Sequence, residues 1–328
     1  MRAIASQVLA NGLRTEFWDT YAAVANRVAD SRLASVMDLS VGATNREHTF
    51  AYFESAPHFK LWPRGGEIVS KGMDSVAFSA QVYEWGRRIP WLKWDKDDDQ
   101  TSSLMNVARQ AGQSAALLPE QFFFDLITNS AGTLPAIPTA PDGAAMFATT
   151  AGGAARFGAT NGNLLSGGGT TAAQILTDFY DCIVQFKKFQ DTEGQPLLMD
   201  SVLESGFIIV HPVELTEAME TAFLQKQQIG DATAGGAQSN LVADSAKRVS
   251  LWSSPRLTDV NDWYCFLGAP PKESTFFLDR EGVQEFTALE GDNNSDHNRN
   301  TAEESIQWES RSGAGIALPY GAIKTTNS

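Results

Sequence analysis

The sequence predicts an α+β fold. Long amphipathic helices come early, at residues 13–28 and 101–127, and an aromatic-rich β-hairpin lies between them at residues 58–96. The last eighty residues consist mainly of short strand patterns separated by polar turns. Helices and strands that are grouped along the chain, without regular alternation, are typical of this class.

Composition narrows the class of protein. The 328 residues, 43% hydrophobic and 20% charged, fit about two globular domains. No apolar run approaches the roughly 18 residues of a membrane span, and residues 1–11 lack the apolar core of a signal peptide. The net charge of −14 disfavours sequence-specific nucleic-acid binding, although a shell around DNA needs no such binding. We expect a soluble protein of the cytoplasm, with Cys182 and Cys265 as buried thiols.

The first element is an amphipathic helix. Between residues 13 and 28 apolar side chains recur every three or four positions, and charged residues occupy the rest of the helical wheel. The apolar positions are Leu13, Phe17, Tyr21, Val24 and Val28. This stripe predicts a helix that packs one face against the rest of the chain.

Residues 58–96 predict a long hairpin. Apolar residues alternate along Val76–Tyr83, after a turn at residues 71–74. Gly86 interrupts the run and is interpreted as a β-bulge. Seven basic and four acidic residues give the segment a net charge of +3. We therefore expect this basic arm to dock against an acidic surface of a neighbouring copy, for which the candidate residues are Glu290, Asp292, Asp296, Glu303, Glu304 and Glu309.

A second long helix follows at residues 101–127. The carboxylates of Asp97–Asp99 suit the positive end of its dipole, and Pro119 is expected to kink it or to divide it in two. Its apolar stripe comprises Leu104, Val107, Ala108, Ala111, Ala115, Leu118, Phe122 and Leu126.

The remaining elements alternate between irregular and regular segments. Residues 130–171 are rich in Gly, Ala, Thr and Pro, and an amphipathic helix then runs from about Ile175 to Phe189. A short buried strand at Gly206–Val210 leads to Pro212, which opens another helix. Strands are predicted at Arg248–Trp252, Trp263–Leu267, Thr275–Leu278 and Ser305–Leu318.

The search for a chemical site finds no catalytic arrangement, and we expect no cofactor and no metal. His211 and Glu214 form a lone pair that is too small to specify zinc. The segment Ser166–Thr171 lacks the lysine of a phosphate-binding loop, so we interpret it as a connection in which Thr170 or Thr171 caps the next helix. No nucleophile elbow is present. The sequence therefore favours a protein without catalytic activity.

Several short motifs, in order, resemble the major head proteins of Mu-like phages. Aromatic segments precede the hairpin, an acidic segment enters the long helix, and a proline lies inside that helix. The matching segments are Phe50–Phe53, Phe59–Trp62, Asp98–Gln100, Pro119–Glu120, Asp142–Phe147, Asn161–Leu164, Phe207–Pro212, Ser254–Leu257 and Asp262–Tyr264. The C-terminus, at Ile306–Gly313 and Pro319–Ile323, is similar to a wider set of capsid proteins. One of the two aromatic residues usual after Asp142-Gly143 is missing.

This resemblance implies a Hong Kong 97-type capsid fold. It implies an N-terminal arm at residues 1–45 and an extended β-hairpin loop at 46–97, which lies over a neighbouring subunit. The peripheral domain, with its long spine helix, takes residues 98–195 and 268–312, and the axial domain takes 196–267 and 313–328.

The implied function is that of a major capsid protein. It would self-assemble into the pentamers and hexamers of an icosahedral tailed-phage head that encloses double-stranded DNA. It would be assembled in the host cytoplasm and reside in the virion, with portal, scaffolding and cement proteins as further partners. Two alternatives stay open: an encapsulin-like nanocompartment shell and a hydrolase with an unrecognised pair of acids.

The expected functional residues lie on the hairpin and at its end. A two-stranded hairpin is too thin to bury several indoles, so we expect the aromatic residues to be anchors between subunits and not part of the subunit core. The candidate interface residues are Trp85, Arg87, Arg88, Trp91 and Trp94.

Overall fold

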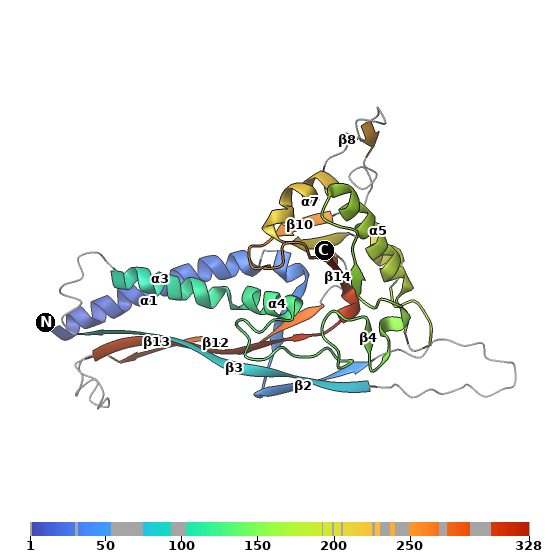
Figure 1. Cartoon of the computed structure of the whole chain (residues 1–328). Coiled ribbons are helices and arrows are strands. Elements are labelled where there is room, and N and C mark those ends of the chain that lie inside the picture. The colour runs from blue at the N-terminus through green and yellow to red at the C-terminus, as the bar shows by residue number, and fades with distance from the viewer. Residues whose placement is uncertain are drawn as a thin grey trace.

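The computed structural model describes twelve segments of the chain: residues 2–29, 32–53, 75–92, 103–191, 193–198, 200–204, 206–224, 227–229, 237–239, 249–268, 274–288 and 303–327. They form two five-stranded sheets, each with helices packed on it (Figure 1). The first sheet is long and narrow, and the second is short and buried. None of the described helices is long and apolar enough to cross a membrane.

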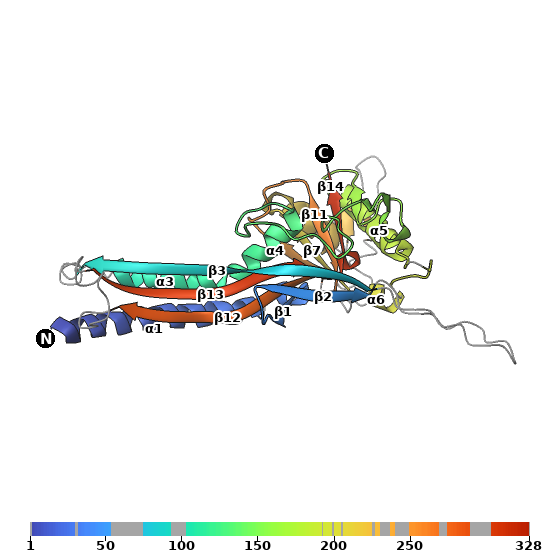
Figure 2. The same cartoon turned by 90° about the horizontal axis from the view of Figure 1, so that it is seen from below.

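The first sheet has the strand order β1-β12-β13-β3-β2. Its members are β1 (Met37–Gly42), β2 (Glu47–Phe53), β3 (Ser75–Leu92), β12 (Thr275–Ala288) and β13 (Glu303–Ile316). β2 and β3 pair as antiparallel strands, with Phe53 opposite Ser75. The partner of β3 thus lies before the hairpin predicted at residues 58–96, whose first half falls outside the described residues. Beyond β2, the strands β12, β13 and β3 continue as a three-stranded arm (Figure 2).

Three helices cover one face of this arm. α1 (Arg2–Ala29) runs beside α3 (Ser103–Ala116), and α4 (Leu118–Thr128) continues toward the second sheet (Figure 1). The predicted spine helix is thus divided at Leu117, with Pro119 in the first turn of α4, where its missing N–H costs no hydrogen bond. Both the first helix and the division of the second are confirmed.

α1 and α3 pack closely because one contact residue is a glycine. A Cβ atom on Gly112 would lie 2.5 Å from the carbonyl oxygen of Phe17. The Phe17 ring in turn stacks on Trp308 of β13, with ring centroids 4.2 Å apart. α1 therefore closes a core between helices and sheet, formed by Leu13, Phe17, Ile89, Trp91, Ala108, Ile306 and Trp308.

The second sheet has the order β10-β7-β11-β14-β6. Its members are β6 (Leu164–Ser166), β7 (Phe207–His211), β10 (Val249–Ser253), β11 (Trp263–Leu267) and β14 (Ala322–Thr326). Every residue of β7 and β11 is buried, which matches their continuous apolar sequences.

Both faces of the second sheet are covered. Phe207, Ile209 and Cys265 pack with α5 (Ala172–Lys188) and α7 (Thr216–Phe223), whereas Ile208 and Phe266 pack with the phenylalanines of α4. α4 therefore connects the two sheets. The shorter elements are η1 (Arg32–Ser35), β4 (Thr150–Ala151), β5 (Ala154–Ala155), η2 (Arg156–Gly158), α6 (Asp200–Glu204), η3 (Val213–Leu215), β8 (Gln227–Ile229), β9 (Ala237–Ser239) and η4 (Pro319–Gly321).

Two details differ from the sequence analysis. Pairing of β3 with β13 runs without a shift through Gly86, so the β-bulge predicted there is absent. β6 and α5, which the predicted boundaries place in the peripheral domain, pair with and pack on the second sheet. Local sequence could not reveal this, because the pairing partner of β6 is β14, about 160 residues later. The domain boundaries themselves stay a prediction.

Candidate functional site

Several of the motifs quoted above meet in one buried polar cluster. The Arg156 guanidinium, 2% exposed, forms a two-pronged ion pair with Asp142 at 2.6 and 3.0 Å. It also donates to the carbonyl oxygens of Ala145 and Met146 and to Oδ1 of Asn163. Asn163 Nδ2 donates to carbonyl oxygens of Pro319 and Ala322. The cluster therefore fastens the irregular segment to the C-terminal strand.

Sequence reasoning missed Arg156, although a signal was present. Asp142 and Arg156 are the only charged residues between positions 130 and 171. A lone acid and a lone base in an otherwise uncharged segment are expected to pair once the segment is buried. Asn163, in contrast, belonged to a quoted motif and has the structural role described above.

A second motif pair joins the spine to the second sheet. Glu120, beside Pro119, accepts a hydrogen bond from Arg256 Nε at 2.9 Å. Ser254 in the same turn donates its N–H to the carbonyl oxygen of His211 at the end of β7. These contacts hold α4 against the strand edge, so the two motifs are structural.

The glycine-rich segment before α5 is occupied by the protein's own groups. Gly168 N–H donates to the Asp178 carboxylate at 2.9 Å, and Gly169 N–H donates to Asn327 Oδ1 at 3.1 Å. Thr171 caps α5 in a reciprocal capping box with Gln174, which confirms one of the two predicted caps. These amides are therefore held by internal acceptors in place of a phosphate.

Three buried titratable groups have shifted pKa values, and two of them, the thiols of Cys182 and Cys265, lie close enough to influence each other. Burial raises the pKa of the Cys182 thiol to about 12 and also raises the pKa of Cys265. Burial lowers the pKa of His211, whose Nδ1 lies 2.8 Å from the Pro212 carbonyl oxygen. Among the described residues no three His, Cys, Asp or Glu side chains gather into a potential metal site. The predicted interface residues Trp85, Arg87, Arg88 and Trp91 all lie on β3, so the arm of the first sheet is the candidate functional site.

The structure corrects the role predicted for Trp91. This side chain is 2% exposed inside its own subunit, and its Nε1 donates to the buried Glu304 at 2.9 Å. α1 and α3 supply the layer that a hairpin alone would lack, so Trp91 belongs to the subunit core. Trp85 is half-buried, and its Nε1 donates to the Ser312 carbonyl oxygen. Trp94 lies outside the described residues.

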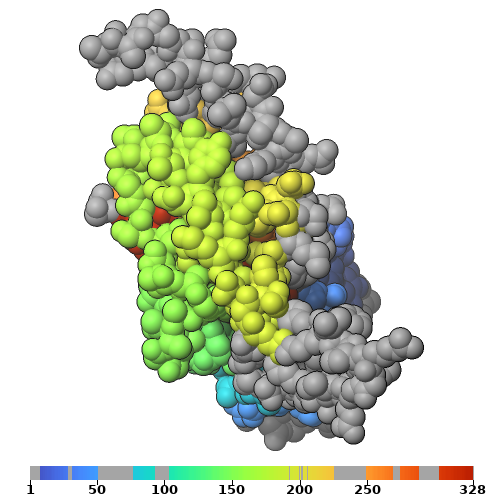
Figure 3. Space-filling view, turned by 90° about the vertical axis from the view of Figure 1, so that its right-hand side faces the viewer, coloured from blue at the N-terminus to red at the C-terminus, as the bar shows by residue number. Residues whose placement is uncertain are grey.

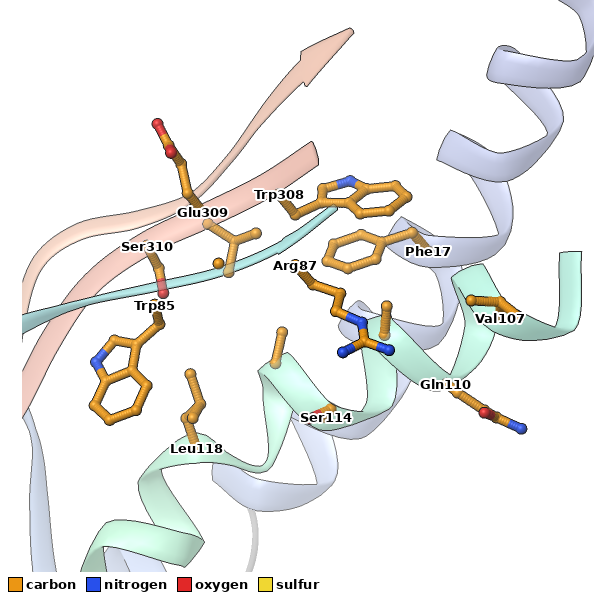
Figure 4. Close-up of a pocket in the computed structure, with 14 residues that line it drawn as sticks. Phe17, Trp85, Arg87, Val107, Gln110, Ser114, Leu118, Trp308, Glu309 and Ser310 are labelled. Carbon is orange, nitrogen blue, oxygen red and sulfur yellow. The ribbon is translucent and has the colours of Figure 1, made fainter. Parts of the chain in front are cut away.

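The two arginines have different surroundings. Arg88 pairs with Glu303 of the same chain at 3.1 Å, because β13 is the neighbour of β3. The guanidinium of Arg87 makes no hydrogen bond or ion pair within the described segments. It extends from β3 toward α3 (Figure 4). Glu303 and Glu304 were expected to receive a neighbouring hairpin, yet they contact β3 of their own subunit. Glu290, Asp292 and Asp296 lie outside the described residues.

Arg87 borders a cavity of about 500 Å³ between α3 and the arm. Its walls are largely aromatic or aliphatic, from Phe17, Trp85, Val107, Leu118 and Trp308, and Gln110, Ser114 and Glu309 add polar groups (Figure 4). The cavity exists because the facing positions are small: Gly86 on β3, and Ala111, Ser114 and Ala115 on α3.

The other face of the arm is polar. Arg311 of β13 contacts Glu84 of β3 at 3.3 Å and Glu281 of β12 at 3.5 Å. These residues, with Gly86 and Glu309, border a second hollow of about 180 Å³. The arm thus has a hollow on each side of Gly86.

Comparison with known proteins identifies the family. The family model described as phage capsid protein matches residues 76–325. The chain belongs to the phage capsid protein family. No curated relative matches the sequence. The match extends from β3 to β14 and so includes strands of both sheets; β1 and β2 lie before it. The narrower resemblance to Mu-like phages stays a prediction.

Solved structures show the fold. The capsid of the cyanophage P-SCSP1u is 10% identical, with a TM-score of 0.58 over 89% of this chain and 86% of that chain. The mature capsid of bacteriophage PhiM1 is also 10% identical, with a TM-score of 0.56 over 90% and 86%. The predicted Hong Kong 97-type fold is confirmed.

A third similar structure concerns the encapsulin-like alternative. The virus-like particle from Pyrococcus furiosus has a TM-score of 0.50 at 10% identity, over 96% of this chain and 98% of that chain. At such identity the likeness shows the fold alone, which other protein shells share. The family match therefore favours a phage capsid over the encapsulin-like alternative.

Figure 3 shows the molecule from one end, where the segment around residues 130–200 forms much of the visible surface. α5 lies in this region and carries the exposed side chains Tyr180 and Val184, one helical turn apart. Single exposed apolar residues are ordinary on a protein surface, so this pair by itself indicates no binding site.

Proposed function

We propose that this chain is the major capsid protein of a tailed phage. In this proposal its copies assemble into the pentamers and hexamers of an icosahedral head around double-stranded DNA. The observation that carries the proposal is the family match across residues 76–325 on a fold shared with solved capsids.

The proposal includes partners and location. Copies of the chain itself are the principal partners, and portal, scaffolding and cement proteins are proposed as additional ones. Assembly takes place in the host cytoplasm, and the product resides in the virion. The enclosed DNA is held without sequence-specific contacts, because the chain carries a net charge of −14.

Within the shell, the β2–β3 hairpin is proposed to reach a neighbouring subunit. Its two described strands end together at Phe53 and Ser75, and 21 residues connect them. An isolated pair of strands is marginally stable in water, so a partner surface is favoured for its end. Arg87 is retained as a proposed interface residue because its guanidinium has no partner in the described part of its own chain.

Electron microscopy of the purified, concentrated protein tests this function. Closed particles of uniform diameter are the expected result, alone or after co-expression with the genes adjacent to its own. Terminase and portal genes beside this gene would further separate a phage head from a cellular nanocompartment. Persistent monomers under all of these conditions would contradict the proposal.

A further inference from the structure

A further hollow, called here the α1 hollow, lies between α1, the start of α4 and the strands β12 and β13. Its volume is about 140 Å³. Its walls are mainly aliphatic, from Ala25 and Val28 of α1, Leu118 of α4 and Val283 of β12. A cavity of about 150 Å³ can hold a molecule the size of benzene. The α1 hollow therefore has room for a small organic ligand.

Ser312 contributes an unpaired hydroxyl group to this hollow. Ser312 is 3% exposed, and its Oγ has no hydrogen-bond partner among the described residues. Side chains alternate along a strand, so Ser312 shares the helix-facing side of β13 with Trp308, which stacks on Phe17 of α1. A buried hydroxyl without a partner destabilises the folded chain, and alanine avoids that cost, as at Ala314 on the same face. The hydroxyl is thus available to a ligand.

Asp279 of β12 lies directly opposite Ser312. Opposed residues of an antiparallel pair point to the same face with Cβ atoms about 5 Å apart, so the carboxylate and the hydroxyl border the hollow together. Within the described segments the carboxylate makes no hydrogen bond or ion pair. Although Asp279 reaches the surface, partial burial raises the pKa of its carboxyl; burial and this nearby carboxylate also raise the pKa of Tyr21.

No basic side chain balances this carboxylate inside the hollow. The described residues that line it include no Lys, Arg or His, and Tyr21 is their only titratable side chain besides Asp279. Arg311 of β13 points to the opposite face of the sheet, where it pairs with Glu84 and Glu281. The charge of the hollow therefore favours a cation.

The cation that fits these walls is an ammonium group on an aliphatic chain. An ammonium group carries N–H donors and no acceptor, which matches the oxygens of Asp279 and Ser312. A bare metal ion needs more ligands than this part of the described chain supplies, since no three His, Cys, Asp or Glu side chains gather there. The aliphatic walls disfavour a hydrated ion and favour contact with methylene groups.

We infer that the α1 hollow is a binding site for a short aliphatic primary amine in its ammonium form. The ammonium group donates to Asp279 and Ser312, and the aliphatic chain packs against Leu118 and Val283. Both aliphatic residues also border the larger cavity near α3, so a longer chain continues between α3 and the arm. A free amine or the lysine side chain of another protein supplies this chemistry. The site belongs to the single subunit and does not depend on shell formation.

Methyl NMR spectroscopy of the unassembled, full-length subunit tests the site. Butylammonium chloride is titrated into protein labelled at the Ala, Leu and Val methyl groups, with butanol and sodium chloride as probes of the chain alone and of the charge alone. Butylammonium should shift the signals of Ala115, Leu118 and Val283 saturably. It should bind about tenfold more tightly than butanol, because its hydrogen bonds are charge-assisted. Equal affinity for butanol, or the same shifts with sodium chloride, would overturn the inference.

Substitutions at the two polar residues separate binding from folding. Asp279→Asn should weaken butylammonium binding about tenfold. Glu281→Gln is the matched control: Glu281 lies two residues away on the opposite face, beside Arg311, and its loss should leave binding unchanged. Ser312→Ala should also weaken binding, while the unliganded subunit melts at the same temperature or higher. Unchanged binding by Asp279→Asn, or a lower melting temperature for Ser312→Ala, would contradict the assignment of these groups to a ligand.

A lysine peptide distinguishes the two sources of the ammonium group. The peptide acetyl-Gly-Lys-Gly-amide is titrated in the same way, with acetyl-Gly-Gly-Gly-amide as its control. Shifts of the same methyl signals by the lysine peptide assign the site to a lysine side chain of another protein. Shifts by butylammonium alone assign it to free amines. If neither ligand moves these signals, the site does not exist.

Discussion

Arg156 illustrates how one buried charge can organise an irregular segment. Its guanidinium satisfies carbonyl oxygens of Ala145 and Met146, the Asn163 amide and the Asp142 carboxylate together. Without it, several buried acceptors would lack a donor, and unsatisfied buried polar groups are costly.

Arg156→Ala should therefore destabilise the subunit strongly. Breaking a buried ion pair from one side costs about 3–5 kcal/mol, since the remaining charge and acceptors stay buried. Urea unfolding of the unassembled subunit measures this change. Arg109→Ala is the control, because its pair with Glu16 is half exposed and should contribute at most about 1 kcal/mol. Equal losses for the two variants would contradict this account of the cluster.

His211 should make stability depend on pH. Burial lowers its pKa below the ordinary 6.5, while Glu220 raises it and Arg32 lowers it further. As the pH falls below about 6.5, the unfolded chain binds a proton that the folded chain resists, so the free energy of unfolding decreases. Above that pH the ring is neutral in both the folded and the unfolded chain, so His211 no longer lowers the free energy of unfolding.

Unfolding experiments from pH 7.5 to 5 on wild type and His211→Gln should isolate this effect. The wild type should lose stability on acidification more steeply than the variant. The raised pKa values of Asp178 and Asp279 act in the opposite sense, because their folded carboxyls keep protons longer, and they are common to both proteins. Identical slopes would exclude a contribution from His211.

Trp91 carries a third residue-scale prediction, which follows from its burial. Trp91→Ala should cost the unassembled subunit about 3–5 kcal/mol, as large-to-small core substitutions do. Thermal melting measures this loss. Leu92→Ala, one residue further along β3 and 42% exposed, is the matched control and should have little effect. A Trp91→Ala subunit of normal stability would restore the interface role expected from the sequence.

At the scale of elements, α1 depends on one small residue for its position. A Cβ on Gly112 would lie 2.5 Å from the Phe17 carbonyl oxygen, and backbone atoms cannot move aside cheaply. Arg14 and Trp18 of α1 also bind Glu285 of β12, and Arg109 of α3 binds Glu16. The contact surface is therefore narrow and specific.

Gly112→Ala should loosen α1, although alanine is the better helix former. Faster limited proteolysis near residues 29–32 and a lower melting temperature are the expected results. Gly282→Ala, at a site where a Cβ meets nothing within 4 Å, is the control and should leave both unchanged. If Gly112→Ala raised the melting temperature without altering proteolysis, the close helix contact would be disproved.

Elements specified by residues close together in sequence could be predicted, whereas features that depend on residues far apart in sequence could not. Helical periodicity and Pro119 predicted α1, α3 and α4, because such signals are local. The burial of Trp91 could not be predicted, since it depends on Phe17 and Trp308, both far away in sequence. The same applies to Arg88, whose partner Glu303 follows after 215 residues. For the candidate site, the sequence indicated Arg87 but not the cavity beside it, because the packing of α3 on the arm joins residues that are far apart in sequence.

At the scale of the whole molecule, the subunit and the shell should be separable. The cores of the described segments are formed by residues of the two sheets and their helices, and Phe53 lies directly opposite Ser75. In this register Tyr52 and Val76 are the last pair whose backbone groups face each other, so Asn-Gly placed between Phe53 and Ser75 would close the hairpin with a four-residue loop. The stability of the unassembled subunit should therefore depend on its sheets and helices, and the closure of shells on the connection between β2 and β3.

Replacing residues 54–74 by Asn-Gly should leave the melting temperature of the unassembled subunit nearly unchanged and should abolish closed shells. The physical reason is that the short loop keeps the register of β2 and β3 but removes the segment that we propose reaches a neighbouring subunit. Calorimetry and electron microscopy on one preparation provide both measurements. A 21-residue Gly-Ser connection of the original length is the control for sequence: it should also fail to close shells, since flexible Gly and Ser residues offer no large side chains to a neighbouring surface. If the Gly-Ser protein assembled normally, the connection would act as a spacer alone. If the Asn-Gly protein did so, residues 54–74 would have no part in the interface.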